Sequence, residues 1–242
     1  MTDHSPDLSN IKALAWDIGG TIFDWHHTIR DEVSAIAEAQ GVELDAAKFA
    51  NMWRFRMFER LQLVRRGDLP WLNADQLHRR VLDEVMEAHP QLKLDINERD
   101  QLNQVWHRMN AWPGSPECLE ALRSRYRVTV LTVMSWAIAV DCSKHNGISW
   151  DGILSCEFLG HYKPEPEAYQ ASARLLGLDI SQVMMCAAHK GDLMAAARAG
   201  MPTAYVPVPG ERGEGNDPDM SPDPSFTVNA TDFADLARQL LA

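Results

Sequence analysis

The sequence predicts an α/β fold, a Rossmann-like parallel sheet into which an all-helical cap is inserted. Three observations predict it. An apolar stretch at residues 11–16 runs into an aspartate and two glycines, and residues 27–110 show helical patterns with many charges and almost no β-branched runs. From residue 112 onward, strand and helix patterns alternate. Such alternation is typical of a parallel sheet with helices on both faces.

The first strand is expected at residues 11–17, and four helical segments follow it. The first two end at glycines, Gly41 and Gly67, and the next two begin at capping residues, Asn73 and Asp95. Glycine favours helix ends, and Asn or Asp side chains cap helix starts. Four consecutive helices are too many for a simple connection between two strands.

The 242 residues allow one large domain or a core with an inserted subdomain. We expect residues 26–110 to form the helical cap. Residues 1–25 and 111–242 would then form the α/β core.

The rest of the core is expected as alternating elements followed by a Gly-, Pro- and Asp-rich surface loop. The expected strands are 127–135, 152–160, 182–189 and 203–208, the expected helices 115–126, 137–147, 165–178, 192–200 and 230–242, and the expected loop 208–225.

The formal net charge of −11 argues against a general nucleic-acid or anionic-membrane binder, because both need basic faces. A small anionic substrate stays compatible with it, and so does a homodimer. The N-terminal segment "MTDHSPDLSN" is polar and acidic, unlike a signal peptide, and no apolar run approaches the roughly 20 residues of a membrane span. We therefore expect a soluble cytoplasmic protein.

The four cysteines lie far apart among apolar neighbours, with no C-x-x-C pair. Buried free thiols are expected rather than disulfides or zinc ligands. These residues are Cys118, Cys142, Cys156 and Cys186.

Polar residues follow several of the expected strands. Asp17 ends the first strand, Thr132 ends the strand after the cap, and Lys163 and Asp192 each follow a later strand. Ligands of parallel sheets bind at the carboxyl ends of the strands, so these side chains should converge. A lysine would supply the countercharge that keeps a poorly hydrated nucleophilic carboxylate ionised. Asp17 as a structural helix-capping acid is the alternative.

In order and spacing, "DIGGTIFDW", "VLTVMS", "HYKPEPEAY" and "AAHKGDLMAAARAG" resemble the four motifs of the haloacid dehalogenase-like (HAD) hydrolase superfamily. The resemblance covers nearly the whole chain, including the helical cap. It implies a nucleophilic aspartate at Asp17, a hydroxyl residue at Thr132, a lysine at Lys163 and an acid at Asp192.

Within that superfamily the chain is most similar to the 2-haloacid dehalogenase branch. Phosphatases carry a second Asp that protonates the leaving group, and here that position is Gly19. The dehalogenase branch also lacks it, because halide leaves without protonation. "AWPGS", the pair Trp53-Arg54 and Tyr169, six residues beyond Lys163, match that branch too.

Three positions depart from the branch. Its second motif usually reads Ser-Asn-Gly, with the Asn binding substrate or halide, whereas here Val133 follows Thr132. An aromatic residue is common where this chain has Gly19, and Asn is common where it has His189.

The resemblance implies hydrolytic dehalogenation of a short 2-haloalkanoic acid through an ester on Asp17. Lys163 would hold Asp17 ionised, Asp192 would orient Lys163 or the water, and His189 is a candidate base. The expected substrate-binding residues are Thr21, Arg54, Thr132, Val133 and Tyr169, with the hydroxyls of Thr21 and Thr132 bonding the carboxylates and Arg54 and Tyr169 facing the substrate. No metal or other cofactor is expected.

Alternatives stay open at this stage. One is a phosphatase of the same superfamily, with Mg²⁺ held by Asp17, the Gly19 carbonyl and Asp192; another is a catalytically impaired binding protein. A sugar kinase is disfavoured, because no second phosphate motif follows "DIGGT". Arg54 lies in an arginine-rich helix, for which a solvated face is the default. Trp53 and Tyr169 are equally compatible with core positions.

Overall fold

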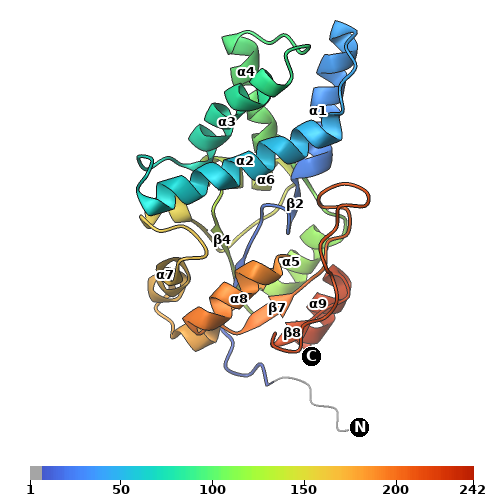
Figure 1. The fold of residues 1–242 in the computed structure, drawn as a ribbon. Coiled ribbons are helices and arrows are strands. Elements are labelled where there is room, and N and C mark those ends of the chain that lie inside the picture. Colours follow the sequence, from blue (N-terminus) through green and yellow to red (C-terminus); the bar gives the residue numbers. More distant parts are fainter. Residues whose placement is uncertain (1–6) are drawn as a thin grey trace.

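The computed structural model describes residues 7–242, so the first six residues of the polar N-terminal segment lie outside the description. A six-stranded parallel sheet, ordered β5-β4-β1-β6-β7-β8, forms the core of the described part. Figure 1 shows helices α1, α3 and α4 at one end of the molecule, with α2 running between them and the sheet. The fold predicted from the sequence, an α/β sheet with a helical insertion, is confirmed.

The first strand lies at the centre of the sheet. β1 (Ala13–Trp16) pairs with β4 on one side and β6 on the other, and all four of its side chains are buried. A strand covered on both faces has to be apolar throughout, as this one is. The remaining strands of the sheet are β4 (Arg127–Thr132), β5 (Gly152–Ser155), β6 (Val183–Ala187), β7 (Thr203–Tyr205) and β8 (Val228–Asn229).

The inserted helices begin and end near the expected residues. Gly41 and Gly67 follow α1 and α2 in the left-handed conformation, and Asn73 and Asp95 each form a capping box. The fourth segment differs, because its last turn tightens into a 3₁₀ helix. The bounds are α1 (Trp25–Gln40), α2 (Ala46–Arg66), α3 (Ala74–Ala88), α4 (Ile96–Asn103) and η1 (Gln104–Arg108).

A small antiparallel ladder pairs the two segments in which the chain enters and leaves the inserted helices. β2 (Phe23–Asp24) pairs with β3 (Asn110–Ala111), in the register Phe23 with Ala111 and Asp24 with Asn110. Two residues give no periodicity, which is why the sequence did not predict this ladder. The exact division into core and cap stays a prediction.

The helices of the core fall between the strands as expected, but two details differ. The strand expected over 152–160 ends at Ser155, whose hydroxyl accepts a hydrogen bond from the Glu157 amide and turns the chain into a 3₁₀ helix, η2 (Cys156–Phe158). β8 was not expected. The remaining helices are α5 (Ser115–Arg123), α6 (Trp136–His145), α7 (Pro166–Leu176), η3 (Ile180–Gln182), α8 (Lys190–Ala199) and α9 (Phe233–Leu241).

All four cysteines are buried and free, as predicted. Burial raises the pKa of the Cys118, Cys142 and Cys156 thiols to about 12, so they stay protonated. Within residues 7–242, no helix has the length and apolar character needed to cross a membrane.

Candidate active site

Asp17 occupies the position that its sequence context predicts, directly after the central strand. It is only 5% exposed, and its backbone amide continues the β1–β6 ladder by donating to Cys186. Its Oδ1 accepts a hydrogen bond from Lys163 at 2.8 Å, and its Oδ2 accepts one from the Thr21 hydroxyl at 2.7 Å. The ring nitrogen Nδ1 of His189 lies 3.1 Å from Oδ2. The buried carboxylate is therefore fully partnered.

Lys163 lies between two carboxylates. Its ammonium donates to Asp17 Oδ1 at 2.8 Å and to Asp192 Oδ2 at 2.7 Å, and all three side chains are nearly buried. Burial alone would raise the pKa of Asp17, but the charge of Lys163 and the bond from His189 outweigh it and hold the pKa well below its usual range. The two carboxylates likewise outweigh burial and raise the pKa of Lys163. Asp17 is ionised at neutral pH.

Tyr169 lies behind Asp192. Its hydroxyl donates to Asp192 Oδ1 at 2.5 Å, its side chain is fully buried, and it does not line the cavity described below. The position does not support the predicted substrate contact. Tyr169 instead fixes the carboxylate that binds Lys163. It is also a core residue, the alternative that the sequence allowed.

His189, at the start of α8, binds a carboxylate at each ring nitrogen. Nδ1 faces Asp17, while Nε2 lies 3.0 Å from Glu211 Oε1 and 3.1 Å from Oε2. Burial would lower the pKa of His189, but the charges and bonds of Glu211 and Asp17 outweigh burial and raise it to about 10. The resting imidazole is therefore a cation, which excludes the predicted role as a base in the resting state.

Glu211 was missed by the sequence analysis, because it lies in the loop between β7 and β8, which has no periodic pattern. Its side chain is buried and also accepts a hydrogen bond from the Trp25 indole at 2.9 Å. Burial would raise its pKa, but the His189 charge outweighs burial and lowers it to about 2. Glu211 is the third carboxylate of the site, after Asp17 and Asp192.

Arg54 projects from α2 toward the loop after β1, and it is 4% exposed, so the default of a solvated face is wrong for this residue. Its guanidinium donates to the carbonyl oxygen of Gly19 at 3.2 Å and lies 4.5 Å from the centre of the Phe58 ring. Trp53, its neighbour, is a core residue that packs edge-on against Trp106.

The second motif contributes less than expected. Thr132 is buried, and its hydroxyl oxygen accepts a hydrogen bond from the Met134 amide. Within residues 7–242 no hydrogen bond joins Thr132 to a carboxylate, so its predicted contact is not present. Val133 does line the cavity. A side chain at Gly19 would meet the Met134 sulfur at 2.9 Å and Arg54 at 3.2 Å, so these two residues fill the place of the aromatic residue common in the branch.

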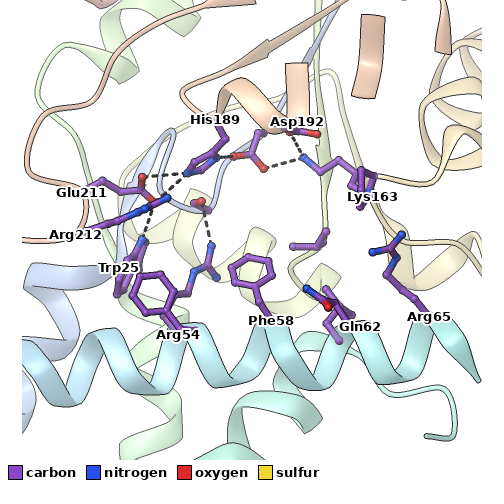
Figure 2. A pocket seen from close by; sticks show the side chains of 17 residues that line it. Trp25, Arg54, Phe58, Gln62, Arg65, Lys163, His189, Asp192, Glu211 and Arg212 are labelled. Atoms are coloured by element: carbon purple, nitrogen blue, oxygen red, sulfur yellow. Dashed lines mark hydrogen bonds and ion pairs between the residues drawn. The ribbon is translucent and has the colours of Figure 1, made fainter. Parts of the chain in front are cut away.

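A cavity of about 480 Å³ lies between α2 and the carboxyl ends of the strands. Figure 2 shows Arg54, Phe58, Gln62 and Arg65 projecting into it from one face of α2, opposite His189 and Lys163. The spacing of these helical residues, three to four apart, places them on that one face. Its walls combine the charged groups with apolar side chains, including Trp25, Phe58, Leu61 and Val133.

The oxygens that a magnesium ion would need are bound to cationic side chains. Lys163 bridges Asp17 and Asp192, and Arg54 binds the Gly19 carbonyl. Mg²⁺ prefers a near-octahedral set of oxygens, and it would compete with both side chains for these. These oxygens are thus better suited to the Lys163 ammonium and the Arg54 guanidinium than to a metal ion.

One group of possible metal ligands lies elsewhere in the described residues, at His161, Glu165 and Glu167. Glu165 is already paired with Arg65 at 2.7 Å, and His161 bonds the same carboxylate at 2.9 Å. These contacts account for the clustering without an ion.

The chain is similar to known hydrolases. A family model described as haloacid dehalogenase-like hydrolase matches residues 11–200. The chain is 27% identical to (S)-2-haloacid dehalogenase 4A of Burkholderia cepacia, over 82% of this chain and 84% of that protein. It is 22% identical to haloacetate dehalogenase H-2 of Moraxella sp. (strain B), over 93% of this chain and 96% of that protein.

Two solved structures share both sequence and shape with the chain. An L-2-haloacid dehalogenase is 33% identical, with a TM-score of 0.90 over 96% of this chain and 99% of that one. A defluorinating L-2-haloacid dehalogenase is 36% identical, with a TM-score of 0.90 over 96% of each chain.

Proposed function

The chain belongs to the haloacid dehalogenase-like hydrolase family, and from that premise we propose that it hydrolyses the carbon–halogen bond of a short 2-haloalkanoic acid, such as a haloacetate. The names of its relatives support this reaction, since they are 2-haloacid and haloacetate dehalogenases. The substrate would be a small anion, in keeping with the arginines of the cavity.

One observation carries the proposal: an ionised nucleophile lines the cavity, and the position two residues later, where a phosphatase has its proton-donating aspartate, is a glycine. Asp17 is kept ionised by Lys163, while the position two residues later is Gly19, against which Met134 and Arg54 pack. A phosphate ester or other basic leaving group needs a proton, whereas halide does not. The site thus suits displacement of a group that leaves as a stable anion.

In the first step, an oxygen of Asp17 attacks the carbon that bears the halogen. The carbon–halogen bond breaks, the halide leaves with the electron pair, and an aspartyl ester forms. Oδ1 accepts one hydrogen bond, from Lys163, whereas Oδ2 faces two donors, Thr21 and His189. Oδ1 is therefore the freer nucleophile, and Oδ2 becomes the ester carbonyl oxygen, held where negative charge later develops.

In the second step, water attacks the carboxyl carbon of Asp17 and releases a 2-hydroxy acid. The Thr21 hydroxyl, which donates to Oδ2, stabilises the tetrahedral intermediate, as donors do in other acyl-transfer sites. Asp17 returns to its carboxylate form beside Lys163. The overall reaction releases one halide and one proton.

Arg54 is the group best placed for the substrate carboxylate. It is anchored by the Gly19 carbonyl and by the Phe58 ring, and it lines the cavity. A guanidinium has five N–H donors in a planar fork, so one can hold Gly19 while others bind a carboxylate. This contact would orient the halogen-bearing carbon toward Asp17.

The two alternatives fit less well. The magnesium phosphatase would need oxygens that Lys163 and Arg54 already bind. An impaired binding protein has no need for a buried aspartate with three partners, which costs desolvation energy.

A halide-release screen tests the proposal. Fluoro-, chloro- and bromoacetate, 2-chloropropionate and a longer 2-bromoalkanoate are incubated with the protein and with Asp17→Asn. We expect halide and the matching 2-hydroxy acid in equal amounts from the wild type and none from the variant. No release from any of these acids, by a folded wild-type protein, would contradict the proposed function.

A further inference from the structure

The carboxylate of Glu211 reaches the catalytic centre from a loop outside the four family motifs. The loop joins β7 to β8, and in Figure 2 Glu211 lies beside His189 and above Trp25. A Cβ atom at Gly20 would come within 2.1 Å of Glu211 Oε1, so the carboxylate lies directly against the turn that follows Asp17. Gly20 has φ +95°, which also favours glycine.

Glu211 and Asp17 together fix the orientation of the His189 ring. Nδ1 lies 3.1 Å from Asp17 Oδ2, and Nε2 lies 3.0 Å from Glu211 Oε1. A ring held at both nitrogens cannot flip without breaking both bonds. Glu211 itself is held by Trp25, whose indole donates at 2.9 Å.

We propose that Glu211 is a positioning residue that makes His189 the general base for hydrolysis of the ester on Asp17, with no part in halide displacement. The inference rests on the proposed function, because the ester is its substrate. The same arrangement, a histidine base whose second ring nitrogen binds an orienting carboxylate, occurs in other hydrolases.

The chemistry of the two steps explains why the same histidine can be a cation first and a base later. In the resting state, Asp17 and Glu211 both face the ring and keep it protonated. Alkylation turns Asp17 into a neutral ester and removes one of these two anions. The other charged groups lining the cavity near the ring are the cations Arg54, Lys163 and Arg212 and one anion, Asp192, which Lys163 binds. With Asp17 esterified, the cations near the ring favour loss of the Nδ1 proton to solvent.

The proton balance closes. With Nε2–H still donating to Glu211, Nδ1 accepts a proton from water as the water oxygen bonds to the Asp17 carboxyl carbon. The bond from that carbon to the alkyl oxygen then breaks, and the alkoxide takes the proton from Nδ1. The new carboxylic acid of Asp17 returns its own proton to Nδ1, which restores the resting state. The proton lost before hydrolysis is the one released overall.

The two steps can be separated in the test. Glu211→Gln keeps the size and one acceptor but removes the charge, and Glu214→Gln is the control, since Glu214 is exposed in the same loop. Rapid-quench halide release and intact-protein mass spectra are recorded with chloroacetate. We expect Glu211→Gln to release about one halide per enzyme at the wild-type rate and then turn over roughly 100-fold more slowly, a loss within the range of general-base effects. The carboxymethyl ester of Asp17 should accumulate.

Further variants keep the outcome decisive. Glu211→Asp keeps the charge but moves the carboxylate away from Nε2, so it should show the same slow second step. It can replace Glu211→Gln in the test if that variant does not fold. His189→Ala should slow the same step, and adding Glu211→Gln to it should cost nothing more. Equal slowing of both steps, or unchanged turnover, would overturn the role of Glu211 while leaving the dehalogenase function intact. Absence of halide from the wild type would instead contradict the proposed function.

Discussion

The guanidinium of Arg54 donates a hydrogen bond to the carbonyl oxygen of Gly19, 3.2 Å away, and so joins helix α2 to the turn that carries the nucleophile. In many proteins a buried arginine binds a carboxylate. Here Arg54 binds a backbone carbonyl and aromatic rings, including Phe58 at 4.5 Å, and it lines the cavity. Part of its hydrogen-bonding capacity is thus available to an anion.

Replacement of Arg54 should therefore affect substrate binding even when the charge is kept. In Arg54→Lys, the lysine lacks the planar guanidinium, so it cannot bind the Gly19 carbonyl and a substrate carboxylate at the same time. We expect kcat/KM for chloroacetate to fall about 10- to 100-fold, the equivalent of one hydrogen bond to a charged group. Arg60→Lys is the control, because Arg60 lies on the same helix but pairs with Glu84. Activity of Arg54→Lys within about twofold of wild type would contradict this role.

Val133 lines the cavity at the position where the dehalogenase branch usually has an amide. Val133→Asn should supply a donor to the substrate or departing halide and raise kcat/KM for chloroacetate, by about 10-fold for one added bond to an anion. Val133→Leu, similar in size to Asn but without the donor, should give no gain. If a stable Val133→Asn protein shows no gain on any haloacid, Val133 shapes an apolar wall instead.

The ammonium of Lys163 binds both Asp17 and Asp192, the two carboxylates that the phosphatase alternative assigns to magnesium. Halide release should therefore be unchanged after dialysis against a chelator, and added Mg²⁺ should not induce hydrolysis of p-nitrophenyl phosphate. Loss of haloacid activity on chelation, with recovery on adding Mg²⁺ back, would favour the phosphatase alternative.

How much of this site could be predicted depended on where each residue lies. Asp17, Lys163 and Asp192 follow strands of a parallel sheet, so topology alone brings them to one edge, and their order along the chain was readable. Glu211 lies in a loop whose path depends on tertiary contacts with Trp25 and His189, and no pattern marks it. The sequence therefore predicted the nucleophile and its countercharge but not the second anion at His189.

Two expectations for individual side chains are not supported by their hydrogen bonds, for a related reason. Tyr169 was expected at the substrate and instead binds Asp192, and Thr132 was expected at a carboxylate and instead accepts from a backbone amide. Periodicity tells which face of an element a residue occupies, but it does not tell which neighbour its hydroxyl finds. In the fold, β8 and the β2–β3 ladder could not be predicted, because each strand has too few residues to show a period.

The Glu211–His189 pair should make stability depend on pH in a defined way. The pKa of Glu211 is lowered from 4.5 to about 2, so the pair stabilises the fold above about pH 4.5 and loses this contribution as the pH falls toward 2. His189, with its pKa raised to about 10, stays protonated throughout that window. The contribution is on the order of 3 kcal/mol at neutral pH.

Urea unfolding of wild type and Glu211→Gln at neutral and acid pH measures this contribution. The difference in the free energy of unfolding between the two proteins should be large near neutral pH and should shrink below about pH 4.5. Glu214→Gln should differ little from wild type at either pH. A difference that does not change with pH would show that Glu211 stabilises the loop only by packing.

The central claim is that Asp17 itself attacks the substrate. It is tested most directly by a single turnover of excess enzyme on chloroacetate in heavy-oxygen water, followed by mass spectrometry of the peptide that contains Asp17. Because water attacks the carboxyl carbon of the ester, we predict that the heavy oxygen enters the Asp17 carboxylate and that the first hydroxy acid released is unlabelled. Label found only in the hydroxy acid, with Asp17 unlabelled, would mean that water displaces the halide directly and would contradict the ester mechanism.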